Sequence, residues 1–306
     1  MSNKERFTRQ VQLLLQILPF IAKYKELALK GGTAINLFIR NMPRLSVDID
    51  LTYLPIKERS ISLDEISKIF TKLQNEVEQK LPNVKGYIKN TRYVNAKQII
   101  FENHERVSVK VEINHVLRGS VFEPVKLPLC RKAEHYFANF TIVNSLSFED
   151  VYAGKICAAL DRQHPRDLFD IKLLFDNEGI SESLRQVFLI YLISNNRPII
   201  ELLNPNRINI EELYYQELDG MTEDPISYND LLETRERLIS EICSNLSINE
   251  RLFLISIKDG SPDWSLLPFS GVENLPAIQW KLLNLNKMEI QKRKILTDKL
   301  KKFLEL

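Results

Sequence analysis

Apolar residues recur at two different spacings along the chain, and the change of spacing divides it into segments. Between residues 5 and 24 they recur every three or four positions, which predicts an amphipathic helix packed on a sheet. Residues 63–81 predict a second long helix, ended by Pro82. Beyond Gly86 the period shortens to two, which predicts three successive strands of a meander, Tyr87–Val94, Lys97–Phe101 and Arg106–His115.

After about residue 145 the alternation stops and helical spacing takes over. Ser147 is a capping residue for a helix over residues 148–160, and Pro165 begins another helix that runs through Asp176. Further helices follow, the last predicted from Asn274 to Phe303. We therefore predict an α+β fold of two domains. Residues 1–145 form a mixed sheet flanked by helices, and residues 146–306 form a mostly α-helical C-terminal domain, so that the molecule is bilobed.

The stretch Ser46–Leu51 alternates polar and apolar residues, as a strand with one buried face does. Ser46, Asp48 and Asp50 therefore share a face. Two carboxylates at this spacing repel each other unless a positive charge lies between them. A hard divalent cation with oxygen ligands, Mg²⁺ or Mn²⁺, satisfies this requirement.

A glycine pair precedes this strand. Leu27–Lys30 predicts a short strand, and Gly31 and Gly32 allow a sharp turn into a helix over residues 33–40. Such a turn leaves free N–H groups at the start of a helix, where a phosphate binds well. Taken alone, a Gly-Gly pair is also an ordinary turn, and an Asp-x-Asp pair is also a solvated strand edge.

The strand over residues 107–114 contributes a third carboxylate. Its valines and Ile113 face one way, while Ser108, Lys110, Glu112 and Asn114 face the other. Glu112 is the candidate to complete a metal-ligand set with Asp48 and Asp50. The alternative is a solvated glutamate on an amphipathic strand. The order of strand, Gly-Gly, helix and Ser-x-Asp-x-Asp resembles the DNA polymerase β-type nucleotidyltransferase superfamily.

A second informative stretch lies in the two predicted helices after residue 147. Lys155 is surrounded in sequence by small and apolar residues, and burying an ammonium without an anionic partner is costly. Triphosphate oxygens or a carboxylate such as Asp170 would provide the partner, and the alternative is a lysine on the helix surface. Arg166 and Asp170 are four residues apart, which predicts that they lie together on the side of the second helix away from its apolar stripe, where they can pair.

The two stretches together resemble the AbiEii/AbiGii toxin family, which includes the MenT nucleotidyltransferase toxins. The resemblance rests on Gly-Gly-Thr-Ala at residues 31–34, on Ser-x-Asp-x-Asp, and on a helical lysine followed by Asp-Arg-x-x-x-Arg-Asp-x-x-Asp. It implies a catalytic set of Asp48, Asp50, Lys155 and Asp170. It implies a nucleotide-binding set of Gly31, Gly32, Thr33, Ser46, Lys155, Arg162 and Arg166. The predicted metal ligands are Asp48, Asp50 and Glu112, and Glu112 rests on the strand pattern.

The resemblance also implies an activity. It implies an enzyme of a toxin–antitoxin or phage-defence system that transfers a nucleotide from an NTP to RNA with Mg²⁺. The expected acceptor is the end of a tRNA, so that translation is blocked, and the expected partner is a separately encoded antitoxin. Two alternatives stay open: a non-catalytic protein that binds nucleotide, and transfer to a hydroxyl of a small molecule or protein.

Composition changes this picture little. The chain has 306 residues, of which 44% are hydrophobic and 27% charged, which is typical of a folded protein. A net charge of +2 is too small to predict nucleic-acid binding from bulk electrostatics, so any basic surface must be local. The last predicted helix concentrates lysines and is the candidate surface. We see no leader sequence and no apolar run of about 18 residues, and therefore expect a cytoplasmic protein without membrane contact.

Overall fold

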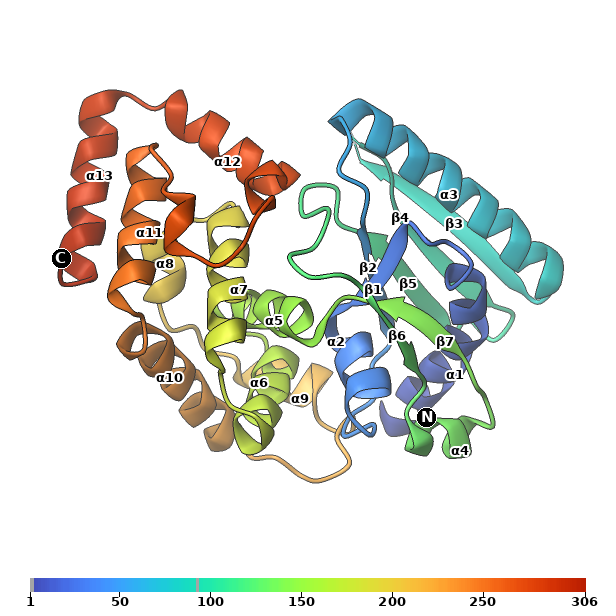
Figure 1. Ribbon diagram of the computed structural model, residues 1–306. Coiled ribbons are helices and arrows are strands. Elements are labelled where there is room, and N and C mark those ends of the chain that lie inside the picture. The colour runs from blue at the N-terminus through green and yellow to red at the C-terminus, as the bar shows by residue number, and fades with distance from the viewer. Residues whose placement is uncertain (1–2, 92–93) are drawn as a thin grey trace. The chain divides into compact units, whose positions relative to one another are not determined.

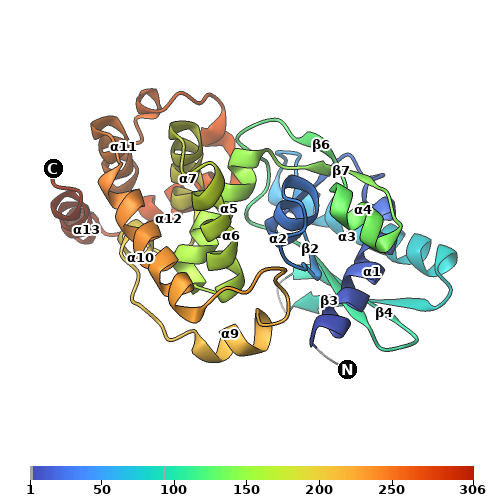
Figure 2. The same ribbon diagram turned by 90° about the horizontal axis from the view of Figure 1, so that it is seen from below.

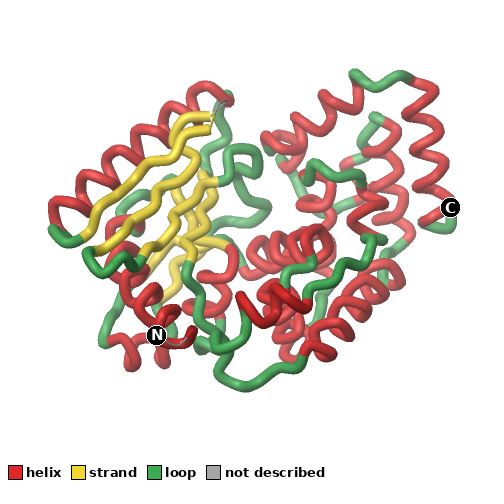
Figure 3. The backbone as a smooth tube through the Cα atoms, turned by 180° about the vertical axis from the view of Figure 1, so that it is seen from behind, coloured by secondary structure: helices red, strands yellow, loops and turns green. Residues whose placement is uncertain are grey.

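A computed structural model describes residues 3–91 and 94–306. The chain forms two compact units. The first comprises the chain up to Val151 together with Tyr215–Ile226, and the second comprises Tyr152–Tyr214 and Ser227–Leu306. The strands named below all belong to the first unit, whereas the second is built from helices and loops (Figure 3). The fold is α+β, as the sequence predicts.

A mixed sheet forms the centre of the first unit (Figure 1). Its strand order is β3-β4-β5-β2-β1-β7-β6. The strands β3, β4 and β5 form the predicted antiparallel meander, and β5 then pairs with β2 in parallel. The strands are β1 (Leu27–Lys30), β2 (Asp48–Tyr53), β3 (Val84–Thr91), β4 (Val94–Asn103), β5 (Ser108–Ile113), β6 (Val125–Pro128) and β7 (Ile142–Ser145). The predicted strand Tyr87–Val94 includes residues 92–93, which lie outside the described ranges.

Two long helices cover the sheet. Helix α1 (Asn3–Ile21) contacts β5 and β7, and α3 (Arg59–Lys80) lies along β3 and β4 (Figure 1). Both helices bury an apolar stripe against the sheet. The apolar face of the central strands β2 and β5 is fully buried, with Ile49, Leu51, Val111 and Ile113 among its residues. The other face of β2 and β5 carries their half-buried polar residues. The alternation in sequence therefore corresponds to a core face and a polar face.

A short helix follows β1 directly (Figure 2). Helix α2 (Gly31–Ala34) continues into a π-helical turn, η1 (Ile35–Ile39), and packs against β1 and β2. The glycine pair is therefore the first turn of the helix instead of a separate turn before it. This is possible because Gly31 adopts a φ of +69°, a left-handed conformation that glycine reaches without steric cost.

The helices of the second unit agree in type with the sequence pattern, but several boundaries differ. The expected helix over residues 274–303 is two helices, α12 (Pro276–Asn286) and α13 (Ile290–Phe303). Residues 197–225 contain two short helices, α8 (Ile199–Leu203) and α9 (Glu211–Glu217), of which α9 ends in the first unit. Within the described ranges, no helix is both long and apolar enough to cross a membrane. The other helices are α5 (Phe148–Arg162), which begins in the first unit, α6 (Pro165–Asn177), α7 (Glu182–Ser194), α10 (Tyr228–Ser244) and α11 (Ile248–Asp259).

Candidate active site

Four charged side chains lie together on the polar face of β2 and β5. In the parallel register Asp48 is opposite Lys110, and Asp50 is opposite Glu112. We call these four residues the carboxylate block. The structure therefore brings the three predicted metal ligands onto one face of two adjacent strands. Neighbouring strands lie about 4.8 Å apart.

Lys110 is the member of the block to which the sequence assigned no role. Its Nζ lies 3.2 Å from Oε2 of Glu112. Burial lowers the pKa of Lys110, but the negative charges of Asp48, Glu112 and Asp50 outweigh it and raise the pKa above its ordinary value. The signal in the sequence is its position two residues before Glu112 on the same face, but its partner on β2 depends on how distant strands pair.

Divalent metal fits the donors of the block but not their present arrangement. Carboxylate oxygens are the ligands that Mg²⁺ and Mn²⁺ prefer. In residues 3–91 and 94–306, however, no three acidic, histidine or cysteine side chains converge on a common point as a ready metal site. Because Lys110 contacts Glu112, the ammonium already compensates part of the negative charge.

The glycine pair lies directly beside the carboxylates. A Cβ atom built on Gly31 would lie 2.7 Å from Oδ2 of Asp50, and one on Gly32 would lie 2.6 Å from Nη2 of Arg44. Any side chain at either position would therefore displace a charged group. This close approach leaves the backbone of the α2 turn next to Asp50, as a phosphate-binding turn beside a metal site requires.

Gly31→Ala should therefore lower activity by more than its effect on folding. Gly179 adopts the same φ of +69° but would have nothing within 4 Å of a new Cβ, so Gly179→Ala is the matched control. We expect both changes to cost about 1–2 kcal/mol of unfolding free energy from the left-handed backbone. Only Gly31→Ala should also displace Asp50 and lower the nucleotide transfer that the resemblance implies, by about a hundredfold. Equal activity of the two variants in steady-state kinetics would contradict this.

Two hydroxyl groups connect the α2 turn to the start of β2. The Thr33 hydroxyl donates to the Asp48 carbonyl at 2.5 Å and forms a 3.0 Å hydrogen bond with the Ser46 hydroxyl. Both residues are almost fully buried. Thr33 and Ser46 therefore hold the backbone of Asp48 in place. Their contact with nucleotide stays a prediction.

Arg44 is a second residue of this site that had no assigned role. It is buried, and its Nη1 donates to the Leu45 carbonyl at 2.9 Å. The backbone around it pairs with a segment far along the chain: Leu45 N donates to Met221 O, and Glu223 N donates to Pro43 O, each at 2.9 Å. The approach to β2 is thus held by residues 221–223, which no local pattern predicts.

The second unit contains a buried ion cluster between α5 and α6. Lys155 Nζ lies 2.9 Å from Oδ1 of Asp167 and 2.9 Å from Oδ2 of Asp170. The side chains of Lys155, Asp167 and Asp170 are at most 5% exposed. Arg162 adds two hydrogen bonds to Asp167, from Nε at 2.6 Å and from Nη2 at 3.0 Å, while its own side chain is 61% exposed. We call these four residues the lysine cluster.

The partners of Lys155 in the lysine cluster are two carboxylates, those of Asp167 and Asp170. Carboxylates surround its ammonium, so the expectation of Asp170 as a partner is confirmed, and the alternative of a surface lysine is wrong. The expectation that Asp170 lies away from the buried face of α6 is wrong, because Asp170 is fully buried, whereas Arg166 is half-buried. The reason is that α6 buries a wider face than its apolar stripe indicates.

Asp167 is the functional candidate that sequence analysis missed. Burial raises its pKa, but Lys155 and Arg162 outweigh burial and hold the pKa far below its ordinary value. It is therefore charged, and the cluster of two cations and two carboxylates is electrically balanced. Its position five residues after Arg162 and twelve after Lys155 could have suggested it only once the turn between α5 and α6 was known.

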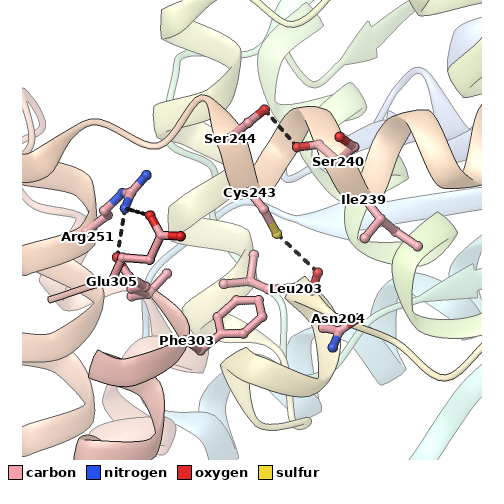
Figure 4. Close-up of a pocket in the computed structure, with 10 residues that line it drawn as sticks. Leu203, Asn204, Ile239, Ser240, Cys243, Ser244, Arg251, Phe303 and Glu305 are labelled. Carbon is pink, nitrogen blue, oxygen red and sulfur yellow. Dashed lines mark hydrogen bonds and ion pairs between the residues drawn. The ribbon is translucent and has the colours of Figure 1, made fainter.

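A cavity lies elsewhere in the second unit. It has a volume of about 590 Å³, and Cys243, Arg251 and Phe303 are among the residues that line it (Figure 4). Arg251 Nη1 donates to the Leu304 carbonyl at 2.8 Å and pairs with Glu305. The arginine is thus used to hold the C-terminal residues, and no predicted site residue lines the cavity. We assign it no part in catalysis.

Comparison with known proteins identifies the family of the chain. A family model described as nucleotidyl transferase AbiEii toxin, type IV toxin–antitoxin system, matches residues 12–282. No curated protein matches the chain. Among solved structures, MenT4, a nucleotidyltransferase toxin from Mycobacterium tuberculosis H37Rv, is similar with a TM-score of 0.65 and 12% identity, over 93% of this chain and 95% of that one. Terminal uridylyl transferase 4 from Trypanosoma brucei, with bound UTP and UMP, matches at 11% identity over 97% of this chain and 93% of that one, but its TM-score is only 0.30.

Proposed function

Because the chain belongs to the AbiEii family of nucleotidyltransferase toxins, we propose that it transfers a nucleotide from an NTP to the acceptor end of a tRNA and so blocks translation. Membership of the family decides for an enzyme over a non-catalytic binding protein. It also implies an antitoxin as partner. The observation that supports the proposed chemistry best is the carboxylate block on β2 and β5, with the α2 turn beside Asp50.

In this proposal Asp48, Asp50 and Glu112 hold divalent metal, and the α2 turn holds the phosphates. The metal, when bound, would polarise the triphosphate and lower the pKa of the attacking hydroxyl. The protein itself positions the reactants: Gly31 and Gly32 admit the phosphates, and Thr33 and Ser46 keep Asp48 in place. Positioning and electrostatic stabilisation account for most of the catalysis in phosphoryl transfer.

We do not propose that Lys155 contacts the triphosphate directly. Lys155 is already neutralised by Asp167 and Asp170, so its ammonium offsets new negative charge only if those contacts loosen. Arg162 differs, because its side chain is 61% exposed, whereas that of Lys155 is 5% exposed. We propose that Arg162 and Arg166 meet the nucleotide, and that Lys155 and Asp170 hold Asp167 and Arg162 in place for the reaction.

One experiment separates the acceptors. Purified protein is incubated with each labelled NTP in turn, with Mg²⁺ and total RNA, and the products are separated by class. We expect label in RNA of tRNA size, at the 3′ end. Label in protein or in a small molecule would favour the alternative acceptors, and no label with any NTP would contradict the proposal.

The basic face of α13 should contribute to RNA binding. Within the part of the chain that the structure describes, the following lysines of α13 are exposed and form no ion pair: Lys292, Lys294, Lys299, Lys301 and Lys302. Changing all five to Gln should raise the KM for RNA severalfold at moderate salt and leave the KM for NTP unchanged, because phosphate contacts release counterions.

Lysines of the first unit serve as the control for this prediction. Lys85, Lys89 and Lys126 are exposed strand residues, and changing them to Gln removes positive charge without changing α13. The comparison is made at several salt concentrations. An unchanged rate for the α13 variant, or an equal loss for both variants, would remove α13 from the RNA-binding surface.

A further inference from the structure

A lysine stands within the carboxylates that we propose as metal ligands. Lys110 is directly opposite Asp48, is two residues from Glu112 on the same strand face, and lies diagonal to Asp50. Its Nζ is 3.2 Å from Glu112 Oε2, and both side chains are partly open to solvent, at 38% and 28%. The ammonium is therefore in a position that a cation from solution can also reach.

The charges of the block explain why a cation is needed there. Three carboxylates on adjacent strand positions repel one another, and a single positive charge reduces the repulsion. Lys30 of β1 is opposite Asp50 on the other side of β2, so two ammonium groups flank three carboxylates, whereas Lys85 of β3 is opposite the single carboxylate of Glu102. The three carboxylates next to Lys110 carry more negative charge than one ammonium can neutralise, and a divalent cation would neutralise more of it.

We propose that Lys110 is an internal cation that holds the carboxylate block together without metal and competes with divalent metal for the same carboxylates. This inference rests on the proposed function, because it concerns the metal site of the same reaction. Lys110 is then a positioning residue. It stabilises the metal-free protein and sets the metal concentration at which the site fills.

The test uses Mn²⁺ alone as the probe, without NTP or RNA, and measures both its affinity and the melting temperature. Lys110→Met removes the ammonium but keeps much of the side-chain volume, Lys110→Arg keeps the charge, and Lys85→Met is the matched control. We expect Lys110→Met to lower the melting temperature of the metal-free protein and to bind Mn²⁺ about tenfold more tightly, since a competing charge is gone. Saturating Mn²⁺ should restore its melting temperature to that of the wild type, and Lys110→Arg should stay close to wild type without metal.

Two results would overturn the inference. A loss of stability that Mn²⁺ does not restore would show a merely structural lysine, and an unchanged or weaker Mn²⁺ affinity would show that the ammonium does not compete. These failures differ from failure of the proposed function. If Mn²⁺ binds wild type and Lys110→Met equally well, only the role of Lys110 is wrong, whereas if it binds neither, the metal site is wrong as well.

Discussion

Replacing Asp48 with alanine is expected to abolish nucleotide transfer and to relieve toxicity in the host cell. The Thr33 hydroxyl donates a hydrogen bond to the backbone carbonyl of Asp48, and Asp48 lies opposite Lys110 in the sheet. Without it the block loses one of three proposed metal ligands, and we expect the rate to fall at least about a thousandfold. Transfer of labelled nucleotide by the purified variant measures this, and growth of cells that express it measures toxicity.

The loss should not come from unfolding. Asp48 is half-buried between the like charges of the other two carboxylates and the ammonium of Lys110, so Asp48→Ala removes repulsion and attraction together and should change the free energy of unfolding little. Glu102→Gln is a matched control, because it removes a carboxylate from β4 of the same sheet, outside the block. A toxic and active Asp48→Ala protein would refute the assignment of the site, whatever the control does.

Replacing Lys155 with methionine is expected to have the largest effect on stability. The change leaves Asp170 buried without the ammonium that lies 2.9 Å from it, and leaves Asp167 with Arg162 alone. Breaking a buried ion pair by removing one partner costs about 3–5 kcal/mol. Denaturant unfolding of the variant measures this loss.

A double variant separates stability from catalysis. Lys155→Met combined with Asp170→Leu replaces both buried charges by apolar side chains, which is often neutral for stability. We expect the double variant to regain most of the unfolding free energy but none of the transfer activity, because Lys155 and Asp170 belong to the proposed site. Recovery of transfer together with stability would show that the cluster serves the fold only.

The local pattern was most informative where one face of an element is buried. Alternation over Ser46–Leu51 and over 107–114 placed Asp48, Asp50 and Glu112 on polar faces, and the structure agrees because the apolar residues between them enter the core. The pattern was least informative for α6. There Asp167 and Asp170 are buried by an ion cluster, and a periodicity of apolar residues cannot show a charged residue that is buried with its partner.

By itself the sequence determined which residues are polar or apolar on each strand and helix, and through the Gly-Gly, Ser-x-Asp-x-Asp and Lys155–Asp170 stretches it indicated the family that the comparisons confirm. Only the tertiary structure decided which of these faces meet. The parallel pairing of β2 with β5 set Lys110 opposite Asp48, and the return of residues 221–223 fixed the backbone around Arg44. The physical reason is that side-chain periodicity is a local property of the backbone, whereas pairing between strands some sixty residues apart depends on the path of the whole chain.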